Sequence, residues 1–368
     1  MAEQIPSKKD LTDVVHPGVI LEQELKESGL SQKDLSDAIG KSAPVISDIV
    51  KGRRNISPEI AYLLEAVLDG ISAEEWLALQ NQYDLAKVNE DDAIAKRKAR
   101  IEAWNQLKEV LNLSYLKKRI GLTGTIEDNV AVVFDYFGVS DIGELRSIAS
   151  NALAYFHMSS KHQTDPVNMM TWMILVRKKS KDEVLDTSFE GKAIDSIIRD
   201  LNLIFYNNEN TSSMVKSTLN AYGIKYIEED HLDKTPVDGY SFWDGENPTI
   251  AVTKRYNRID NYAFAIMHEL GHIVKHLFYD KSLNFIDSEA PSNGIDKEKE
   301  ANAFASKALR GDAPLDKCFA SWYNPFAAKR EILRIADEFK INKSIITGQF
   351  QHFKNSYAIC RDLLDPIR

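Results

Sequence analysis

The stretch YAFAIMHELGHIVKH, Tyr262–His276, contains the pattern His-Glu-x-x-His. Apolar residues recur at helical spacing on both sides of the pattern without a proline, which predicts a helix. Residues four positions apart share one helix face, so His268 and His272 can reach one metal ion. Glu269 projects about 100° away and can serve as a general base toward a water. Gly271 costs about 1 kcal/mol inside a helix, so we expect another backbone or a substrate to approach closely there.

The pattern alone is suggestive rather than decisive. With 8 histidines in 368 residues, chance produces it in roughly one chain in a hundred of this length. A third ligand would strengthen the case, because catalytic zinc usually takes three protein ligands. Downstream, DKEKEANAFASKALR supplies Glu298 and Glu300 at the start of a predicted helix with an apolar stripe. The helix dipole stabilises acidic residues in the first turn of a helix, which would explain Glu298 without a metal. It explains the presence of both Glu298 and Glu300 less well.

The N-terminal part of the chain predicts short helices with clear start signals. Ser31 with Asp34, and Ser72 with Glu75, resemble capping boxes. A serine followed by proline at 57–58 is typical of a helix start. Apolar residues at helical spacing predict four or five helices of 8 to 14 residues. Helices this short are unstable alone, so we expect them to pack as a bundle.

Within this bundle, LSQKDLSDAIGKSAPVISDIVKGRRNISP (30–58) places a turn at Gly40 between two short helices, as in a helix-turn-helix. Ser42 could cap the second helix. A plain helical hairpin is the competing interpretation. In a helix-turn-helix, the early residues of the second helix lie near base edges, which predicts contacts from Ser42, Ala43, Pro44 and Ser47. Phosphate contacts would come from Gln32, Lys33, Lys51, Arg53 and Arg54.

Charge and composition exclude several classes of protein. The net charge of −9 argues mildly against bulk nucleic-acid binding, but four basic residues face one acidic residue over 41–54. A second basic run covers 93–119, where a solvated helix face is an equally good explanation. The longest apolar run, Met169–Val176, is far shorter than the roughly 20 residues that a membrane span needs. The N-terminus lacks the apolar segment of a signal peptide, and 2 cysteines are too few for a disulfide framework. We therefore expect a cytoplasmic protein without membrane contact.

The remaining segments are predicted to be mostly helical, with strands in one region. One long helix is expected from about Ile94 to Leu116, and further helices over 121–207 with stops at Gly138 and at 165–166. GIKYIEE and NPTIAVTKRY are β-branched and aromatic runs that predict strands. Helices follow around His268 and Glu300 and over the C-terminal segment. The predicted fold is mainly α with a small α+β domain.

The sequence RIDNYAFAIMHELGHIVKH, followed by EKEANAFASKAL, resembles the ImmA/IrrE family of metallopeptidases over roughly residues 215–350. The resemblance implies a zincin-like domain with a short sheet, one Zn²⁺ per chain and zinc-dependent endopeptidase activity. It implies His268, His272 and Glu300 as metal ligands and Glu269 as the catalytic base, with Glu298 as the reserve third ligand. The stretch LRGDAPL after the second helix departs slightly from the family pattern.

Residues 16–86, from HPGVILEQEL to WLALQNQYDLA, resemble the HigA-like antitoxins of the XRE helix-turn-helix class. The resemblance implies a lambda-repressor-like helical bundle and a homodimeric repressor that binds double-stranded operator DNA beside a toxin partner. One feature departs from that expectation: over 14–70, six basic residues face nine acidic ones. DNA binding would then depend on the basic edge at 41–54 and be strongly salt-dependent.

These observations predict a helix-turn-helix domain (1–84), a basic linker helix (85–120), a helical intermediate region (121–214), a peptidase core (215–310) and a helical C-terminal segment (311–368). The predicted function is a DNA-binding regulator or antitoxin whose zinc endopeptidase domain cleaves a repressor or partner protein. In the alternative, a HigA-type antitoxin and autorepressor uses a non-catalytic peptidase-like domain for toxin binding or dimerisation. The presence of Glu269 beside both histidines favours the first function, the one with an active endopeptidase.

Overall fold

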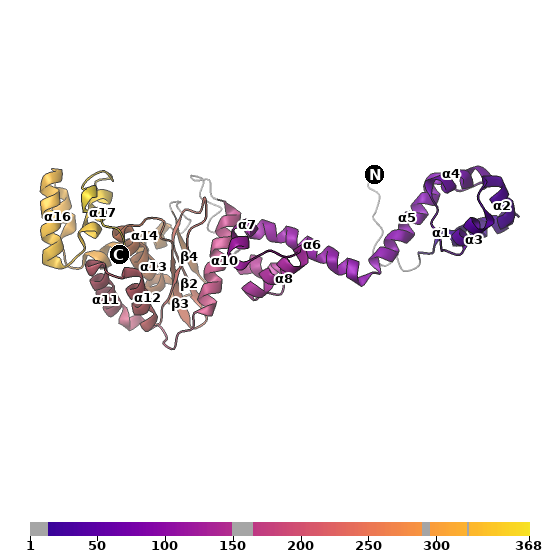
Figure 1. Ribbon diagram of the computed structural model, residues 1–368. Coiled ribbons are helices and arrows are strands. Elements are labelled where there is room, and N and C mark those ends of the chain that lie inside the picture. The colour runs from indigo at the N-terminus through magenta and orange to yellow at the C-terminus, as the bar shows by residue number, and fades with distance from the viewer. Residues whose placement is uncertain (1–13, 149–164, 289–294, 322–323) are drawn as a thin grey trace. The chain divides into compact units, whose positions relative to one another are not determined.

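The computed structural model describes residues 14–148, 165–288, 295–321 and 324–368. The chain divides into two compact units, Met1–Glu102 and Ala103–Arg368, drawn in Figure 1. The described residues are mainly helical, with a four-stranded sheet in the second unit. This confirms the predicted fold class. No helix in the described ranges has the length and apolar character needed to cross a membrane.

The first unit is a bundle of helices, as predicted, although α5, with 17 residues, is longer than the 8 to 14 residues expected. They are α1 (Pro17–Glu27), α2 (Gln32–Ile39), α3 (Ala43–Val50), α4 (Pro58–Val67) and α5 (Ala73–Asn89). Both capping boxes form: the Ser31 side chain accepts a hydrogen bond from the Asp34 amide, and Ser72 from the Glu75 amide. The core is built mainly from Leu21, Leu35, Ile46, Ile49, Leu64 and Trp76. The caps fix where each helix begins, and the shared core supplies the stability that single helices lack.

The turn between α2 and α3 follows the prediction except in one detail. Gly40 ends α2 with φ at 65°, in the left-handed region that glycine tolerates. Ser42 precedes α3, but its side chain makes no capping hydrogen bond, so that part of the prediction is wrong. The start of α1 packs directly on the end of α3: a Cβ on Gly18 would lie 1.9 Å from the Ile49 carbonyl oxygen. A glycine is therefore required for this contact.

The long helix predicted from about Ile94 to Leu116 is broken in the structure. Helix α6 (Asp92–Val110) ends before Asn112, and α7 (Leu113–Ile120) begins after it. The Asn112 side chain accepts a hydrogen bond from the Tyr115 amide and so caps a new helix, which periodicity alone did not indicate. Helical segments follow at α8 (Ile126–Phe137), 142–148 and α10 (Pro166–Asp182). The stop predicted at Gly138 is confirmed. At 165–166 a helix begins, with Asp165 as the N-cap of α10, and the residues before it lie outside the described ranges.

The sheet contains β1 (Lys225–Glu228), β2 (Val237–Asp244), β3 (Asn247–Val252) and β4 (Asn284–Ser288), in the order β1-β3-β2-β4. Strands β1 and β3 are parallel, and the other pairs are antiparallel. The sequence analysis predicted β1 and β3 but missed β2 and β4. A signal for β2 existed, because Gly245 and Glu246 form a two-residue hairpin loop between the paired residues Asp244 and Asn247, with Gly245 at φ 61°.

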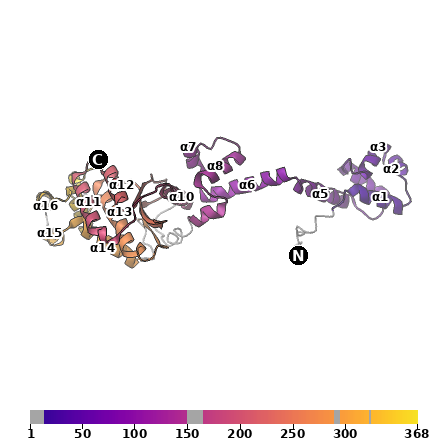
Figure 2. The same ribbon diagram turned by 90° about the horizontal axis from the view of Figure 1, so that it is seen from below.

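Helix α13 (Ile259–His272) lies at the centre of the second unit. In two views, Figures 1 and 2, the sheet has α13 on one side and α10 on the other. Alternate residues along β3 follow this arrangement: Ile250 packs in the α13 cluster and Ala251 in the α10 cluster. The surrounding elements are η1 (Gly191–Ala193), α11 (Ile194–Asn207), α12 (Thr211–Ala221), η2 (Ile273–Leu277), α14 (Ile295–Arg310), α15 (Leu315–Ser321), α16 (Pro325–Phe339), α17 (Lys343–Phe353) and η3 (Arg361–Leu363).

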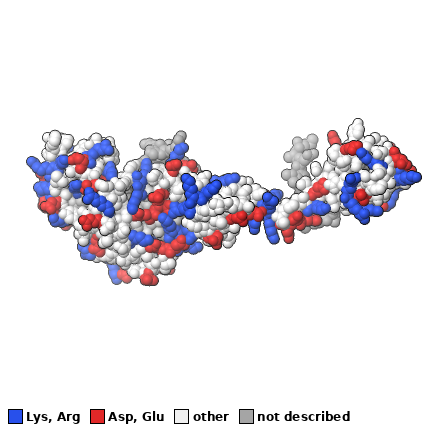
Figure 3. Space-filling model, viewed as in Figure 1, with Lys and Arg blue, Asp and Glu red and all other residues white. Residues whose placement is uncertain are grey.

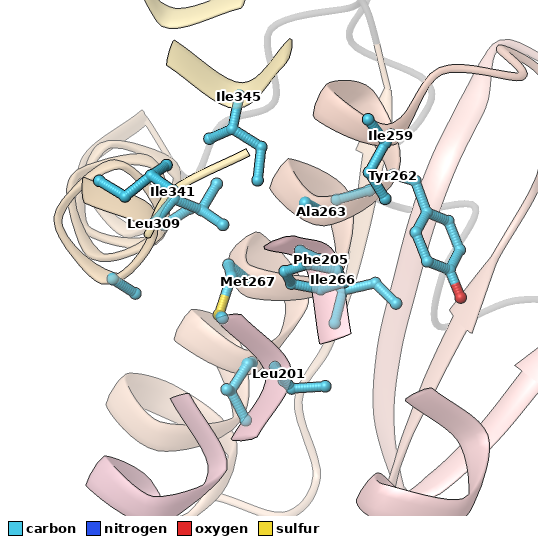
Figure 4. Packing of buried hydrophobic residues seen from close by; sticks show 14 of the residues in the cluster. Leu201, Phe205, Ile259, Tyr262, Ala263, Ile266, Met267, Leu309, Ile341 and Ile345 are labelled. Carbon is cyan, nitrogen blue, oxygen red and sulfur yellow. The ribbon is translucent and has the colours of Figure 1, made fainter. Parts of the chain in front are cut away.

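Apolar side chains hold α13 in place from several directions. Figure 4 shows Ala263, Ile266 and Met267 of α13 among Leu201 and Phe205 of α11 and residues of α14 and α17. Almost every residue of α13 is buried, including the His-Glu-x-x-His pattern. Close packing leaves such a helix little freedom, so side chains on it are held with defined geometry.

Candidate functional site

The two histidines of the pattern point their Nε2 atoms at one another, 2.9 Å apart. The Glu298 carboxylate completes the group, with one oxygen 3.3 Å from His268 Nε2 and the other 3.5 Å from His272 Nε2. One ligand atom from each of the three residues lies within 4.8 Å of the other two. The side chains of His268 and His272 are 1% and 0% exposed. Three metal-ligating groups thus converge inside the second unit.

The third member of this group differs from the residue that the sequence analysis favoured. Glu300 is 60% exposed, and its nearest histidine is His276, at 3.9 Å. The reason lies in the register of α14, whose buried residues Ala301 and Ala305 face α13. Glu298 precedes Ala301 by three positions and shares that face, whereas Glu300 is rotated by about 100°. The structure therefore places the reserve candidate, Glu298, with the histidines, and Glu300 outside.

Helices α13 and α14 approach each other very closely at Gly271. A Cβ there would lie 3.1 Å from the Phe304 ring, 3.2 Å from the Ala301 Cα and 3.3 Å from the Ala301 carbonyl oxygen. The expectation that another backbone passes close to this glycine is confirmed. This contact lets Glu298 of α14 reach the histidines of α13.

Groups around the histidines hold their rings. Asn302 Oδ1 lies 3.1 Å from His268 Nδ1, so Nδ1 carries the proton and the Nε2 lone pair faces Glu298. The His272 ring stacks on Phe285 of β4, with centroids 4.1 Å apart and planes within 9°. His276 is 7% exposed, and its Nε2 lies 3.3 Å from the Lys297 carbonyl oxygen.

Glu269, the predicted base, is fully buried against β2. A Cβ on Gly239 would lie 2.2 Å from Glu269 Oε1 and 2.8 Å from its Cγ. Only a residue without a side chain leaves room for the carboxylate at this point. The sequence analysis missed Gly239, because its strand was not recognised and a single glycine carries no signal of its own.

The protonation states suit metal binding. Burial lowers the pKa of His272 to about 4, although a hydrogen bond to Glu298 acts in the opposite direction. Burial acts to raise the pKa of the Glu298 carboxyl, but the interactions with the imidazole rings of His268 and His272 outweigh it and lower the pKa to about 2. Near neutral pH His272 is neutral and Glu298 ionised, as metal ligands must be. Donors of a tetrahedral zinc lie roughly 3.3 Å apart, close to the spacings here. The residues fit a zinc ion.

In the first unit, the predicted base-contacting residues lie at the beginning of α3. Ser42, Ala43 and Pro44 are exposed and Ser47 is half-buried. The residues predicted to contact phosphate are exposed at Lys33, Lys51, Arg53 and Arg54 and half-buried at Gln32. Figure 3 shows basic and acidic side chains interspersed over the visible face of each unit. Basic residues that could bind an anion therefore occupy only a small part of the surface of this unit.

Together these features define a helix-turn-helix protein with a metallopeptidase-type centre. The model of the helix-turn-helix family matches residues 21–76, and that of the IrrE N-terminal-like domain, a peptidase family, matches residues 219–350. The chain belongs to the helix-turn-helix family through its N-terminal domain and carries an IrrE N-terminal-like domain. It combines a helix-turn-helix domain with a peptidase-family domain.

Several relatives resemble the N-terminal part. Virulence-associated protein I of Dichelobacter nodosus is 38% identical over 88 residues, 24% of this chain and 81% of that protein. The uncharacterized HTH-type transcriptional regulator YddM of Escherichia coli K12 is 32% identical over 71 residues, 19% of this chain and 74% of that protein. A solved structure of Pseudomonas aeruginosa antitoxin HigA with higBA promoter is 38% identical and covers 24% of this chain and 91% of that chain, with a TM-score of 0.21.

Proposed function

We propose that this protein is a DNA-binding regulator whose second unit is a zinc-dependent endopeptidase acting on a repressor or another partner protein, such as a toxin. The observation that carries the proposal is the convergence of His268, His272 and Glu298, with Glu269 beside them on the same helix. A domain kept only as a scaffold would have no need of this combination. The match to a peptidase-family model over residues 219–350 supports it.

One zinc ion per chain would be held by the two Nε2 atoms and the Glu298 carboxylate. When bound, zinc polarises the carbonyl of a scissile peptide bond and lowers the pKa of a water toward 7. The Glu269 carboxylate then takes a proton from the attacking water and passes it to the leaving amine. Burial of Glu269 strengthens its electrostatic interactions, since water does not screen them. Asn302 keeps His268 in the tautomer that presents Nε2.

For the first unit we propose that α3 enters the major groove of double-stranded operator DNA, with the protein acting as a homodimer in the cytoplasm. Support comes from the helix-turn-helix family match and from the exposed residues at the start of α3. The HigA structure with its promoter and the regulator name of YddM describe those proteins, and the same class of partner is proposed for this chain.

The first test is the zinc content of the full-length protein, measured by elemental mass spectrometry after zinc loading and desalting. We expect about one zinc per chain in the wild type and almost none in His272→Ala. Cleavage of an unfolded protein such as reduced casein, abolished by Glu269→Gln with zinc retained, would establish catalysis. Absence of zinc from the wild type would contradict the peptidase proposal. It would leave the alternative of an antitoxin whose second unit binds a toxin or a dimer mate.

A further inference from the structure

The basic loop that follows α3, residues 51–56, is tied to helix α5 by side-chain hydrogen bonds. The Asn55 amide donates to the Asp84 carboxylate, at 3.2 Å to Oδ1 and 3.1 Å to Oδ2. The Gln80 amide donates to the same carboxylate at 3.1 Å, and its oxygen accepts the backbone N–H of Ile56 at 2.9 Å. Gln80 is 5% exposed and Asp84 is half-buried. Two consecutive residues of the loop are thus held by two residues one turn apart on α5.

A ring from the start of α1 fills the space between the beginning of the basic loop and α5. A Cβ on Gly52 would lie 3.4 Å from Cγ of His16. On its other side the His16 ring meets Tyr83 of α5 edge-on, with centroids 4.8 Å apart. Helix α5 therefore supports the loop at two places, through this ring at Gly52 and through hydrogen bonds at Asn55.

Arg53 and Arg54 are the side chains that the supported loop presents to solvent. Both are exposed, and neither has an ion-pair partner in the part of the chain that the structure describes. Their backbone N–H groups donate to the Asp48 carbonyl oxygen, at 2.7 Å and 3.1 Å respectively, which fixes the chain where the two side chains leave it. Arginines held in this way lose less conformational entropy on binding a phosphate than arginines on a free loop. The support from α5 therefore bears on DNA affinity.

The charge of Asp84 acts against DNA binding, which makes its place beside the basic loop informative. A carboxylate near phosphate-binding arginines repels DNA. Its oxygens accept hydrogen bonds from the amides of Gln80 and Asn55, and these bonds explain why an acidic residue stands there. Both α5 residues lie beyond residues 21–76, the range of the helix-turn-helix family match. The support is thus a feature of this chain outside the matched region.

We propose that Gln80 and Asp84 are positioning residues that hold the two arginines of the basic loop for contact with DNA phosphates. Helix α5, which leads from the first unit toward the second, then sets the DNA affinity of the first unit together with α2 and α3. This role rests on the proposed DNA-binding function and adds residues that do not touch DNA themselves.

The test is the DNA affinity of full-length Asp84→Ala, measured by fluorescence anisotropy on the duplex upstream of the protein's own gene and, at low salt, on an unrelated duplex. Removal of a negative charge alone would tighten binding, whereas loss of the support should weaken it roughly five- to tenfold on both duplexes, because phosphate contacts do not depend on sequence. Asp84→Asn keeps Oδ1 as an acceptor and should bind at least as tightly as the wild type. Glu90→Ala is the matched control, because Glu90 is exposed at the end of α5 and its replacement removes the same charge without weakening binding.

A second comparison shows whether Asp84 acts through the arginines. In the Arg53→Ala/Arg54→Ala background, Asp84→Ala should cause no further loss of affinity, because the groups that it positions are gone. Melting followed by circular dichroism gives the unfolding midpoint of each variant, and affinity is compared well below it, so that unfolding does not count as lost binding.

The outcomes separate the positioning role from the proposed function. Unchanged or tighter binding by Asp84→Ala, an equal loss with and without the two arginines, or an equal loss in Asp84→Asn would overturn the positioning role while wild-type DNA binding stands. Failure of the wild type to bind either duplex would instead contradict the DNA-binding function itself, and the positioning role with it.

Discussion

Asn302 Oδ1 lies 3.1 Å from Nδ1 of His268 and can only accept the hydrogen bond, so the histidine must donate. Asn302 stands four residues after Glu298, on the same helix α14. Residues with this spacing share a helix face. One helix therefore supplies both the carboxylate beside the two histidines and the group that sets the tautomer of one of them. Any shift of α14 along α13 would disturb both contacts at once.

Replacement of Asn302 tests this dependence. We expect Asn302→Leu to weaken zinc binding by roughly 10- to 100-fold, since the His268 ring loses the partner that orients it. Asn302→Asp keeps an acceptor at the same place and should bind zinc at least as well as the wild type. Affinity is measured by competition with a chromophoric chelator. Equal affinities for the leucine variant and the wild type would show that packing alone orients the ring.

The two glutamates of α14 give a second prediction. Glu298→Gln removes a charged donor beside the histidines and should reduce zinc content to well below one per chain. Glu300→Gln changes a side chain that is 60% exposed and should leave zinc content unchanged. The same elemental measurement decides between them. A loss of zinc in the Glu300 variant alone would restore the assignment that the sequence suggested.

Gly239 should matter for catalysis but not for zinc. In Gly239→Ala the new methyl group would lie 2.2 Å from Glu269 Oε1, so the carboxylate must move away from its buried position. We expect cleavage of casein to fall at least 100-fold with about one zinc per chain retained, a loss typical of general acid–base catalysis. Gly191→Ala is the control, because its Cβ would meet only the Phe278 ring at 3.5 Å, an ordinary contact. Full activity in Gly239→Ala would remove Glu269 from the proposed mechanism.

The elements that were predicted correctly from the sequence are those that local spacing and capping determine. The helix that contains His268 and His272, the capping boxes and the turn at Gly40 all follow from spacing and cap chemistry within one segment. The choice between Glu298 and Glu300 could not be made in this way. It depends on which face of α14 meets α13, a tertiary contact set by the close approach at Gly271. The apolar stripe of α14 contained this information, because Glu298 continues the stripe and Glu300 does not.

Strands β2 and β4 were not predicted, because they also depend on contacts made in the folded chain. Strand β2 contains Asp238 and Gly239 among its aromatic residues, which weakens the apolar alternation expected of a strand. It pairs with β3 through a short hairpin and with β4 on its other side, and β4 is distant from it in sequence. The position of Gly239 against Glu269 therefore became visible only in the folded chain.

His16 gives a prediction about pH and the first unit. Its Nδ1 accepts a hydrogen bond from the Gly18 amide at 2.9 Å, which requires the neutral ring, and burial lowers its pKa from 6.5. For a histidine whose pKa is lowered by folding, the stabilisation is complete above pH 6.5 and is lost as the pH falls below it. Hydrogen exchange of α1 and α3, corrected for intrinsic rates, should therefore be faster at pH 5.5 than at pH 7.5. In His16→Asn, which keeps a capping acceptor that does not titrate, the corrected exchange should be the same at both pH values.

The basic edge of the first unit gives the last prediction, on DNA affinity. Arg53 and Arg54 are exposed after α3, whereas Lys41 is held by Glu59 at 2.7 Å. Each phosphate contact contributes about 0.9 to the slope of log K against log salt concentration. The double variant Arg53→Ala/Arg54→Ala should therefore lower that slope by about 2, measured on the duplex upstream of the protein's own gene. Lys26→Ala, whose side chain pairs with Glu22 on α1, is the matched control and should leave the slope unchanged. An equal slope in the double variant and the wild type would mean that DNA contacts another surface, such as the basic run of α6.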